Sequence, residues 1–272
     1  MVIKKMMEIL AKNKSANLLL LAVFLTSCSS RITVKNPANR FISPEAAGEA
    51  LKGNVNLFLS GGVNSEVNLS KETTNEPLQF DDTQKLDTLI GLGASVGIVK
   101  NIDLLLLSNG DNYPLMFGFK YQILGASKKE KKAKGHSVSV VALIGSAVDE
   151  QENDDAVELT PQDDEAKIDL SVTSKEASLL YGYRFDKNSL FYMGPRYTVT
   201  QFDGTLETDN VTLDGQKIDY WGDSFAGVMG FMFDFGSNTK IMIEGSHQKL
   251  NWQRTTNKTF NTISAGVGFS WY

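Results

Sequence analysis

Cys28 is the only cysteine among 272 residues, so its chemistry cannot be an internal disulfide. A single thiol can be buried, react, pair with another chain or accept a covalent modification. Its surroundings favour the last of these uses. Cys28 follows the almost purely apolar stretch 17–25 and stands among the small residues Ser27, Ser29 and Ser30. This position indicates a thiol that is modified during export.

The first 27 residues have the three parts of a secretory signal. Lys4, Lys5, Lys12 and Lys14 precede the apolar stretch, and small residues follow it. The apolar stretch is about half of the ~20 residues that a membrane-spanning helix needs. Residues 1–27 are therefore predicted to be a removable signal peptide and not a retained anchor.

The residues Leu25-Thr26-Ser27-Cys28 resemble the lipobox of bacterial lipoproteins. The resemblance implies cleavage before Cys28, a diacylglyceryl group on its thiol, and an acyl chain such as palmitate on the new amino terminus. Several acyl chains hold a protein on a bilayer far more firmly than one. Ser29 stands where an Asp would resemble the inner-membrane retention signal, which implies the outer membrane. An ordinary signal peptide with an incidental cysteine is the alternative.

Other residues with catalytic potential are few. The only histidines are His136 and His247, and neither belongs to an Asp-x-His or paired-aspartate pattern at a predicted strand end. The sequence has no nucleophile-elbow serine, HExxH motif or P-loop. The acidic segment 149–165 carries nine carboxylates without the spacing of a calcium loop. We therefore expect no enzyme, no metal site and no cofactor apart from the covalent lipid on Cys28.

The elements that position the remaining side chains are predicted to be strands, because apolar residues recur with a period of two from residue 54 onward. In YPLMFGFKYQI, for example, Tyr113, Phe117 and Tyr121 share an apolar face. Short connections at 100–101, 186–188 and 236–238 alternate with longer ones, as in outer-membrane barrels with short periplasmic turns. Ten strands are expected, at 54–66, 86–99, 102–108, 113–125, 136–148, 167–185, 189–204, 217–235, 239–252 and 260–272.

The length of these segments favours a membrane barrel over a soluble fold. Almost every segment has nine or more residues, enough to cross a bilayer at a tilt, whereas soluble strands average five to six. Aromatic residues such as Tyr113 end the apolar faces, which suits the interface belts of a barrel. A spanning sheet must also close, since an open edge would leave backbone groups unpaired in lipid.

The carboxyl end resembles the assembly signal of outer-membrane barrels, an amphipathic last strand closing on an aromatic residue. Here Trp271 is in phase with the apolar face, and Tyr272 lies one residue beyond it, which departs from the family pattern. The resemblance implies an all-β, single antiparallel up-and-down barrel over 54–272, recognised by the barrel-assembly machinery. Residues 28–53 are then a lipidated spacer, and both termini lie in the periplasm. A soluble periplasm-facing β-sandwich lipoprotein that binds a ligand or partner is the alternative.

Charged residues on the face opposite the apolar one predict how the lumen is filled. A ten-stranded barrel is narrow, and small barrels are largely filled by side chains. Three cations and three anions fall on this face, so they are expected to form ion pairs that exclude a wide pore. These six lumen candidates are Lys120, Glu176, Arg184, Arg196, Asp234 and Glu244.

The expected function is a structural, adhesive or narrow-transport role in the outer membrane. The net charge of −5 argues against nucleic acid as a partner. Membrane lipid is the expected partner. The acidic segment 149–165 is interpreted as a solvated outer loop, and the alternative is that it binds cations that bridge the phosphates of lipopolysaccharide. The lysine-rich segment KKEKKAKG (128–135) has two readings, a contact with anionic headgroups or a soluble turn.

Overall fold

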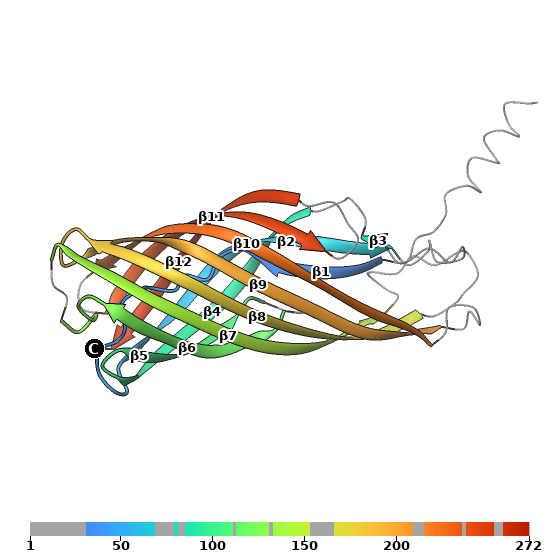
Figure 1. The fold of residues 1–272 in the computed structure, drawn as a ribbon, viewed down its shortest axis with the longest axis horizontal. Coiled ribbons are helices and arrows are strands. Elements are labelled where there is room, and N and C mark those ends of the chain that lie inside the picture. Colours follow the sequence, from blue (N-terminus) through green and yellow to red (C-terminus); the bar gives the residue numbers. More distant parts are fainter. Residues whose placement is uncertain are drawn as a thin grey trace, which may run out of the picture.

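The computed structural model describes residues 31–68, 79–80, 85–110, 113–130, 133–152, 166–208, 215–235, 238–252 and 258–271. Their strands form one antiparallel sheet that closes on itself. Closure occurs because β2 (Gly53–Asn68) pairs with β4 (Lys85–Val99) along one edge and with β12 (Lys258–Trp271) along the other. Figure 1 shows the resulting elongated barrel. Within the described ranges, no helix is long and apolar enough to cross a membrane.

Ten strands make the wall, and each pairs with its neighbours in sequence, which confirms the predicted up-and-down barrel. All ten predicted segments are strands, with ends that differ by at most four residues. The two-sheet sandwich alternative is wrong, because a single closed sheet is present. Besides β2, β4 and β12, the wall strands are β5 (Ile102–Ser108), β6 (Leu115–Leu124), β7 (Gly135–Glu152), β8 (Ala166–Arg184), β9 (Ser189–Thr208), β10 (Gln216–Phe235) and β11 (Thr239–Trp252).

The two ends of the barrel differ in the length of most of their connections, with 125–134 as the long exception at the end that otherwise has short turns. We call the short-turn end the one with connections 100–101, 125–134, 185–188 and 236–238. The other is the long-connection end, where the chain passes through 69–84, 109–114, 153–165, 209–215 and 253–257. β2 starts and β12 finishes at the short-turn end, so an even number of wall strands follows directly.

Side chains alternate between the two faces of the wall. Along β6, Phe117 is 53% exposed, whereas its neighbour Met116 is fully buried. Over the half of the barrel nearer the short-turn end, the outward residues of the other strands are also mostly large and apolar. Leaving this surface in water would cost about 25 cal/mol for each Å². The outer wall therefore suits hydrocarbon, as in transmembrane barrels.

Near the long-connection end, the polarity of the two faces is reversed. The inward side chains there are apolar or aromatic, and Phe202 packs against both Tyr220 and Trp252 at ring-centroid distances of 5.8 and 5.5 Å. Outward neighbours such as Gln201 and Asp219 are polar and exposed. An apolar interior with a polar exterior is the arrangement of a fold in water. The reversal therefore marks the level at which β8, β9 and β10 leave the lipid.

A further strand, β1 (Arg31–Pro37), lies beside the upper part of β2. Residues 62–64 of β2 pair with β4 and with β1 at once, so β1 must occupy the edge of β2 opposite β4. Nearer the short-turn end, at residues 53–59, that same edge pairs with β12. The short β3 (Gln79–Phe80) pairs with Val67 and Asn68 at the upper end of β2. We call the junction of β2 with β12 the seam, and β1 takes over the β2 edge above it.

Two sequence-based expectations for the amino-terminal part need correction. The described ends do not lie on one side, because Arg31 pairs with Asn68 at the long-connection end and Trp271 pairs with Gly53 at the short-turn end. Residues 31–52 are also no external spacer, since most of residues 38–47 are buried inside the barrel. The spacer prediction was wrong because β1 is short and residues 38–52, which cross the lumen, have no strand period. The signal peptide 1–27 and Cys28 lie outside the described residues.

Tyr113 corrects the predicted aromatic belt at one position. Its ring is 6% exposed and its hydroxyl accepts a hydrogen bond from Arg40, so it faces the lumen and not the lipid interface. The alternating pattern was extended too far, because β6 begins only at Leu115.

Candidate functional site

The lumen is occupied by residues 38–50, which we call the plug segment. It enters the lumen after β1, crosses it, and leaves at the short-turn end, where the Leu51 N–H donates to Gly97 O. Pro44 lacks an N–H, and Gly48 adopts a φ of 90°, so no regular element forms. The backbone groups of the plug segment must therefore bond to the barrel wall, and many of them do.

Asn39 fastens the plug segment to both strands of the seam. Its Oδ1 accepts hydrogen bonds from Thr262 Oγ1 at 2.9 Å and Ser264 Oγ at 2.7 Å, both on β12. Its backbone N–H donates to Ser60 Oγ of β2 at 3.3 Å, and the Gly61 N–H donates to Ser264 Oγ at 2.8 Å. Small polar side chains thus bond across the seam at the level where β12 stops pairing with β2 and β1 begins to pair with it.

Glu244 of β11 holds the middle of the plug segment by its backbone. Its two carboxylate oxygens accept the N–H groups of Arg40 at 2.9 Å and Phe41 at 3.0 Å, and the Tyr192 hydroxyl donates to it at 2.6 Å. Tyr192 of β9 reaches Glu244 by lying over Gly230, its register partner on β10, where a Cβ would lie 2.4 Å from the tyrosine ring. Glu244 is 2% exposed, so these bonds form away from water.

The Arg40 side chain lies between Glu176 of β8 and Tyr113, which precedes β6. Its Nε and Nη2 both lie 3.0 Å from Glu176 Oε2, and Nη2 also donates to the Tyr113 hydroxyl at 3.1 Å. Arg196 approaches the same Glu176 oxygen at 4.0 Å and donates to the Ala38 carbonyl. Two guanidinium groups thus approach one buried carboxylate. The nearby Glu244 supplies the second negative charge that balances the two cations.

A second layer of charges lies nearer the short-turn end. Arg184 binds Glu45 of the plug segment through two bonds of 2.8 and 2.6 Å and reaches Asp234 at 3.3 Å. Lys120 lies 2.9 Å from Asp103 and donates to the carbonyl of Glu45 at 2.7 Å. Paired forks between guanidinium and carboxylate are strong and directional. This layer therefore holds the plug segment in position and pairs the negative charge of Glu45 with Arg184.

The described lumen charges include all six predicted candidates, but several partners differ from those expected. Arg196–Glu176 and Arg184–Asp234 join predicted residues. Lys120 instead pairs with Asp103, and Glu244 bonds to plug backbone. Sequence reasoning missed the following partners: Arg40, Glu45, Asp103, Tyr192 and the plug backbone. Asp103 was hidden because four consecutive leucines follow it in β5, which leaves no alternation to assign faces.

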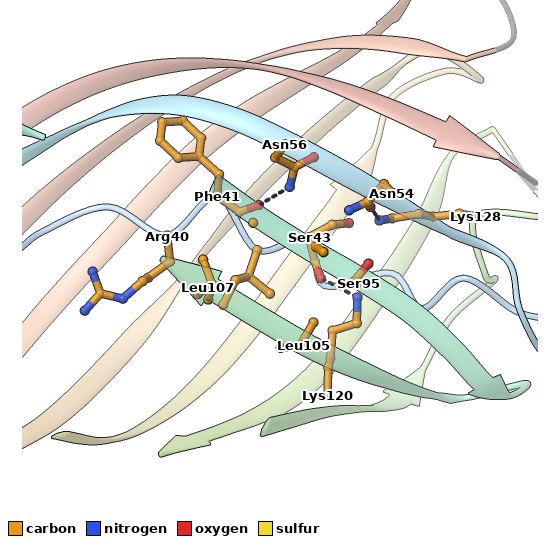
Figure 2. Close-up of a pocket in the computed structure, with 13 residues that line it drawn as sticks. Arg40, Phe41, Ser43, Asn54, Asn56, Ser95, Leu105, Leu107, Lys120 and Lys128 are labelled. Carbon is orange, nitrogen blue, oxygen red and sulfur yellow. Dashed lines mark hydrogen bonds between the residues drawn. The ribbon is translucent and has the colours of Figure 1, made fainter. Parts of the chain in front are cut away.

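A small cavity of about 20 Å³ lies between the plug segment and strands β2, β4 and β5 (Figure 2). At its rim Lys120 donates to Ser43 O at 3.1 Å, and Lys128 donates to Asn54 Oδ1 at 2.7 Å. Burial at the short-turn end lowers the pKa of Lys128, although Asp103 and Glu45 act to raise it. Smaller cavities flank Arg40 and Arg184. Each of these cavities has room for about one water molecule, so the plug segment fills nearly all of the lumen around it.

The remaining sequence candidates lie away from the lumen. His136 is exposed beside Tyr181, and His247 is exposed and bonded to Asn261 at 2.7 Å. Among the residues that the structure describes, no group of three or more His, Cys, Asp or Glu side chains could hold a metal. In the lysine-rich segment, Lys128 is buried, while Lys129 pairs with Glu49 at 2.6 Å at the short-turn end. Residues 149–152 of the acidic segment belong to β7, and residues 153–165 lie outside the residues that the structure describes.

A closed ten-stranded barrel with an apolar outer wall and buried ion pairs in its lumen has the architecture of an outer-membrane β-barrel protein. Among solved structures, the outer membrane protease OmpT from Escherichia coli is similar with a TM-score of 0.39 at 10% identity, covering 90% of this chain and 98% of that chain. Ail, the attachment invasion locus protein of Yersinia pestis solved with the heparin analogue sucrose octasulfate, is similar with a TM-score of 0.31 at 13% identity, covering 81% and 100%. No protein-family model and no curated protein matches the chain.

Proposed function

We propose that this chain is a lipid-anchored outer-membrane β-barrel that is closed by its own plug segment and has a structural or adhesive role at the cell surface. The observation that carries the proposal is the filled lumen. Residues 39–41 and 45–47 bond to six wall strands, and the contacts include buried ion pairs at two levels. A wide aqueous path would require all of these contacts to open together.

The length of the central strands supports a role outside the membrane. β9 and β10 have 20 residues each, about twice the nine to eleven that a transmembrane strand needs. Their excess lies at the long-connection end, where the outward side chains are polar. In outer-membrane barrels the longer connections face the exterior. The projecting wall would therefore be offered to lipopolysaccharide or to a partner surface.

Placement in the outer membrane further involves two partners. The covalent lipid on Cys28 and the apolar wall both favour membrane lipid as the main surrounding. The last strand, β12, ends on the exposed aromatic Trp271, which fits recognition by the barrel-assembly machinery. Neither interaction needs a catalytic residue.

The test measures conductance and attachment. Purified wild-type protein in planar bilayers should show very low conductance, and a large, stable open channel would contradict the closed lumen and favour a general-diffusion pore. Cells carrying the wild type should attach to a test surface better than cells carrying Lys217→Ala with Asp219→Ala on the projecting wall. Unchanged attachment, together with a leakier envelope on deletion of the protein, would favour the structural role over the adhesive one.

Narrow transport is the second candidate. It is favoured by the water-sized cavities beside Arg40 and Lys120, which mark where the plug segment packs least tightly against the wall. Brief, small openings of the wild-type protein in the same recordings would support it.

A further inference from the structure

The path of the amino-terminal chain determines on which side of the barrel it emerges. β1 runs antiparallel to β2, with Pro37 opposite Gly62 and Arg31 opposite Asn68. The chain that precedes Arg31 therefore meets the barrel at the long-connection end. It reaches the short-turn end only after passing through the lumen as the plug segment.

The two ends of the barrel lie much farther apart than the link from Cys28 to Arg31 can span. From Gly53 to Asn68 the strand rises about 3.4 Å per residue, or about 40 Å along a barrel axis tilted by about 40° from the strands. The link from Cys28 to Arg31 spans at most about 11 Å when fully extended. Cys28 therefore cannot reach the short-turn end while β1 is paired as described.

The position of β1 also brings this link to the wall of the barrel. β1 occupies the β2 edge that β12 holds lower down, so it lies at the perimeter and not at the centre of the opening. The outward residues of β12 are apolar up to Ile263, which is 85% exposed, and polar from Asn261 onward. β1 ends near that same boundary, because Pro37 pairs with Gly62 just above the seam, and its first residue, Arg31, lies beyond the boundary, opposite Asn68.

We propose that the chain threads its own barrel, so that the acylated amino terminus emerges at the outer face and its lipid enters the outer leaflet. The periplasmic leaflet, the usual site for a lipid anchor of this type, is excluded by the distance. This inference rests on the proposed function for two points, lipidation of Cys28 and short turns on the periplasmic side. The partner is a lipid surface, reached from outside the cell.

The experiment uses one protease site inserted at three places in the full-length chain. The test insertion follows Ser30. One control follows Lys187 in the short turn between β8 and β9, and the other follows Gly215 between β9 and β10. Intact cells receive external protease, and parallel samples are treated after detergent lysis to show that each site can be cut. Heat-modifiable migration checks that each variant has folded, and mass spectrometry weighs the barrel fragment and the released peptide.

The expected result is cleavage after Ser30 and after Gly215 in intact cells, protection after Lys187, and loss of the acyl mass from the barrel fragment. Protection after Ser30 with cleavage after Gly215 would overturn the threading and leave the barrel and its orientation in place. Cleavage after Ser30 that releases a peptide without acyl mass would overturn the lipid part. Cleavage after Lys187 with protection after Gly215 would invert the barrel, and the proposed function would fail with the inference.

Discussion

Replacement of Glu244 by alanine should release the plug segment. The carboxylate accepts two plug N–H groups and the Tyr192 hydroxyl, and it is almost completely buried. Each donor left unsatisfied away from water costs about 1–3 kcal/mol. Three such donors give roughly 3–9 kcal/mol if the plug segment stays in place, and the chain can avoid this cost by leaving the lumen.

Even the lower figure has a measurable consequence. A loss of about 3 kcal/mol raises the unplugged population about a hundredfold, at about 1.4 kcal/mol for each factor of ten. Planar-bilayer recordings of Glu244→Ala should therefore show openings that the wild type lacks. Amide hydrogen exchange at residues 40 and 41 should accelerate in the same variant, which locates the change.

Glu207→Ala is the matched control, because it removes the same charge from an exposed position on β9. It should leave conductance and exchange unchanged. The reasoning is refuted if Glu244→Ala assembles normally, keeps the amides of residues 40 and 41 protected, and conducts no more than the wild type. In that case the remaining ion pairs alone would hold the plug segment.

Four further outcomes are expected. Phe117→Arg should block assembly while Phe117→Leu does not, because a charge on the lipid face costs about 2–4 kcal/mol near the midplane; folded yield by heat-modifiable migration measures this. Arg184→Ala should lower the unfolding temperature, since the buried Glu45 loses its two bonds to the guanidinium, and differential scanning calorimetry reports the shift. The backbone N–H of Asn188 holds the pKa of Asp186 below its ordinary value of 3.8. The hydrogen bonds of this carboxylate therefore stabilise the turn fully above pH 3.8 and are lost as the pH falls through the lower folded value; Asp186→Asn should make amide exchange in the turn 185–188 less dependent on acid. Cys28→Ser should abolish labelling by radioactive palmitate, and an unmodified wild-type amino terminus in mass spectrometry would refute the lipoprotein prediction.

The barrel wall could be predicted from the sequence because its physical cause is local. One face of each strand meets lipid and the other a polar lumen, and this contrast produces a period of two that single segments display. The prediction weakened wherever the contrast disappeared. Asp103 lies in a run of leucines, and Tyr113 lies just before β6, where the alternation continues but the strand does not.

The plug segment could not be predicted for a different reason. Its residues satisfy their backbone groups with side chains from strands that are far away in sequence, as when Glu244 accepts the N–H of Arg40. No local period records such a partner. The charge balance of the lumen gave a partial signal, since three cations and three anions were visible on the wall. It could not reveal that Arg40 and Glu45 supply further charges from inside.

The sequence also could not predict whether an inward-facing position would accept a larger side chain. Gly118 faces inward, yet a Cβ there would lie 1.9 Å from the carbonyl oxygen of Ala142. A large side chain at this position would clash with the backbone of β7. The pattern of glycines on the inner face therefore reflects close packing of strands as well as space for plug residues.

Tethering of the plug segment at both ends limits how long any opening can last. Residues 38–52 connect β1 to β2, and both strands are paired in the wall. A displaced segment would therefore be a closed loop and not a free tail. Bringing the ends of a ten-residue loop together takes about 10–100 ns, and here both ends are already held in place. The effective concentration of the displaced plug segment near the lumen would remain in the millimolar range or above, as for short flexible linkers. Openings should consequently appear as brief flickers, and a lasting open state would require a ligand that occupies the vacated lumen or the unpairing of β1 from β2.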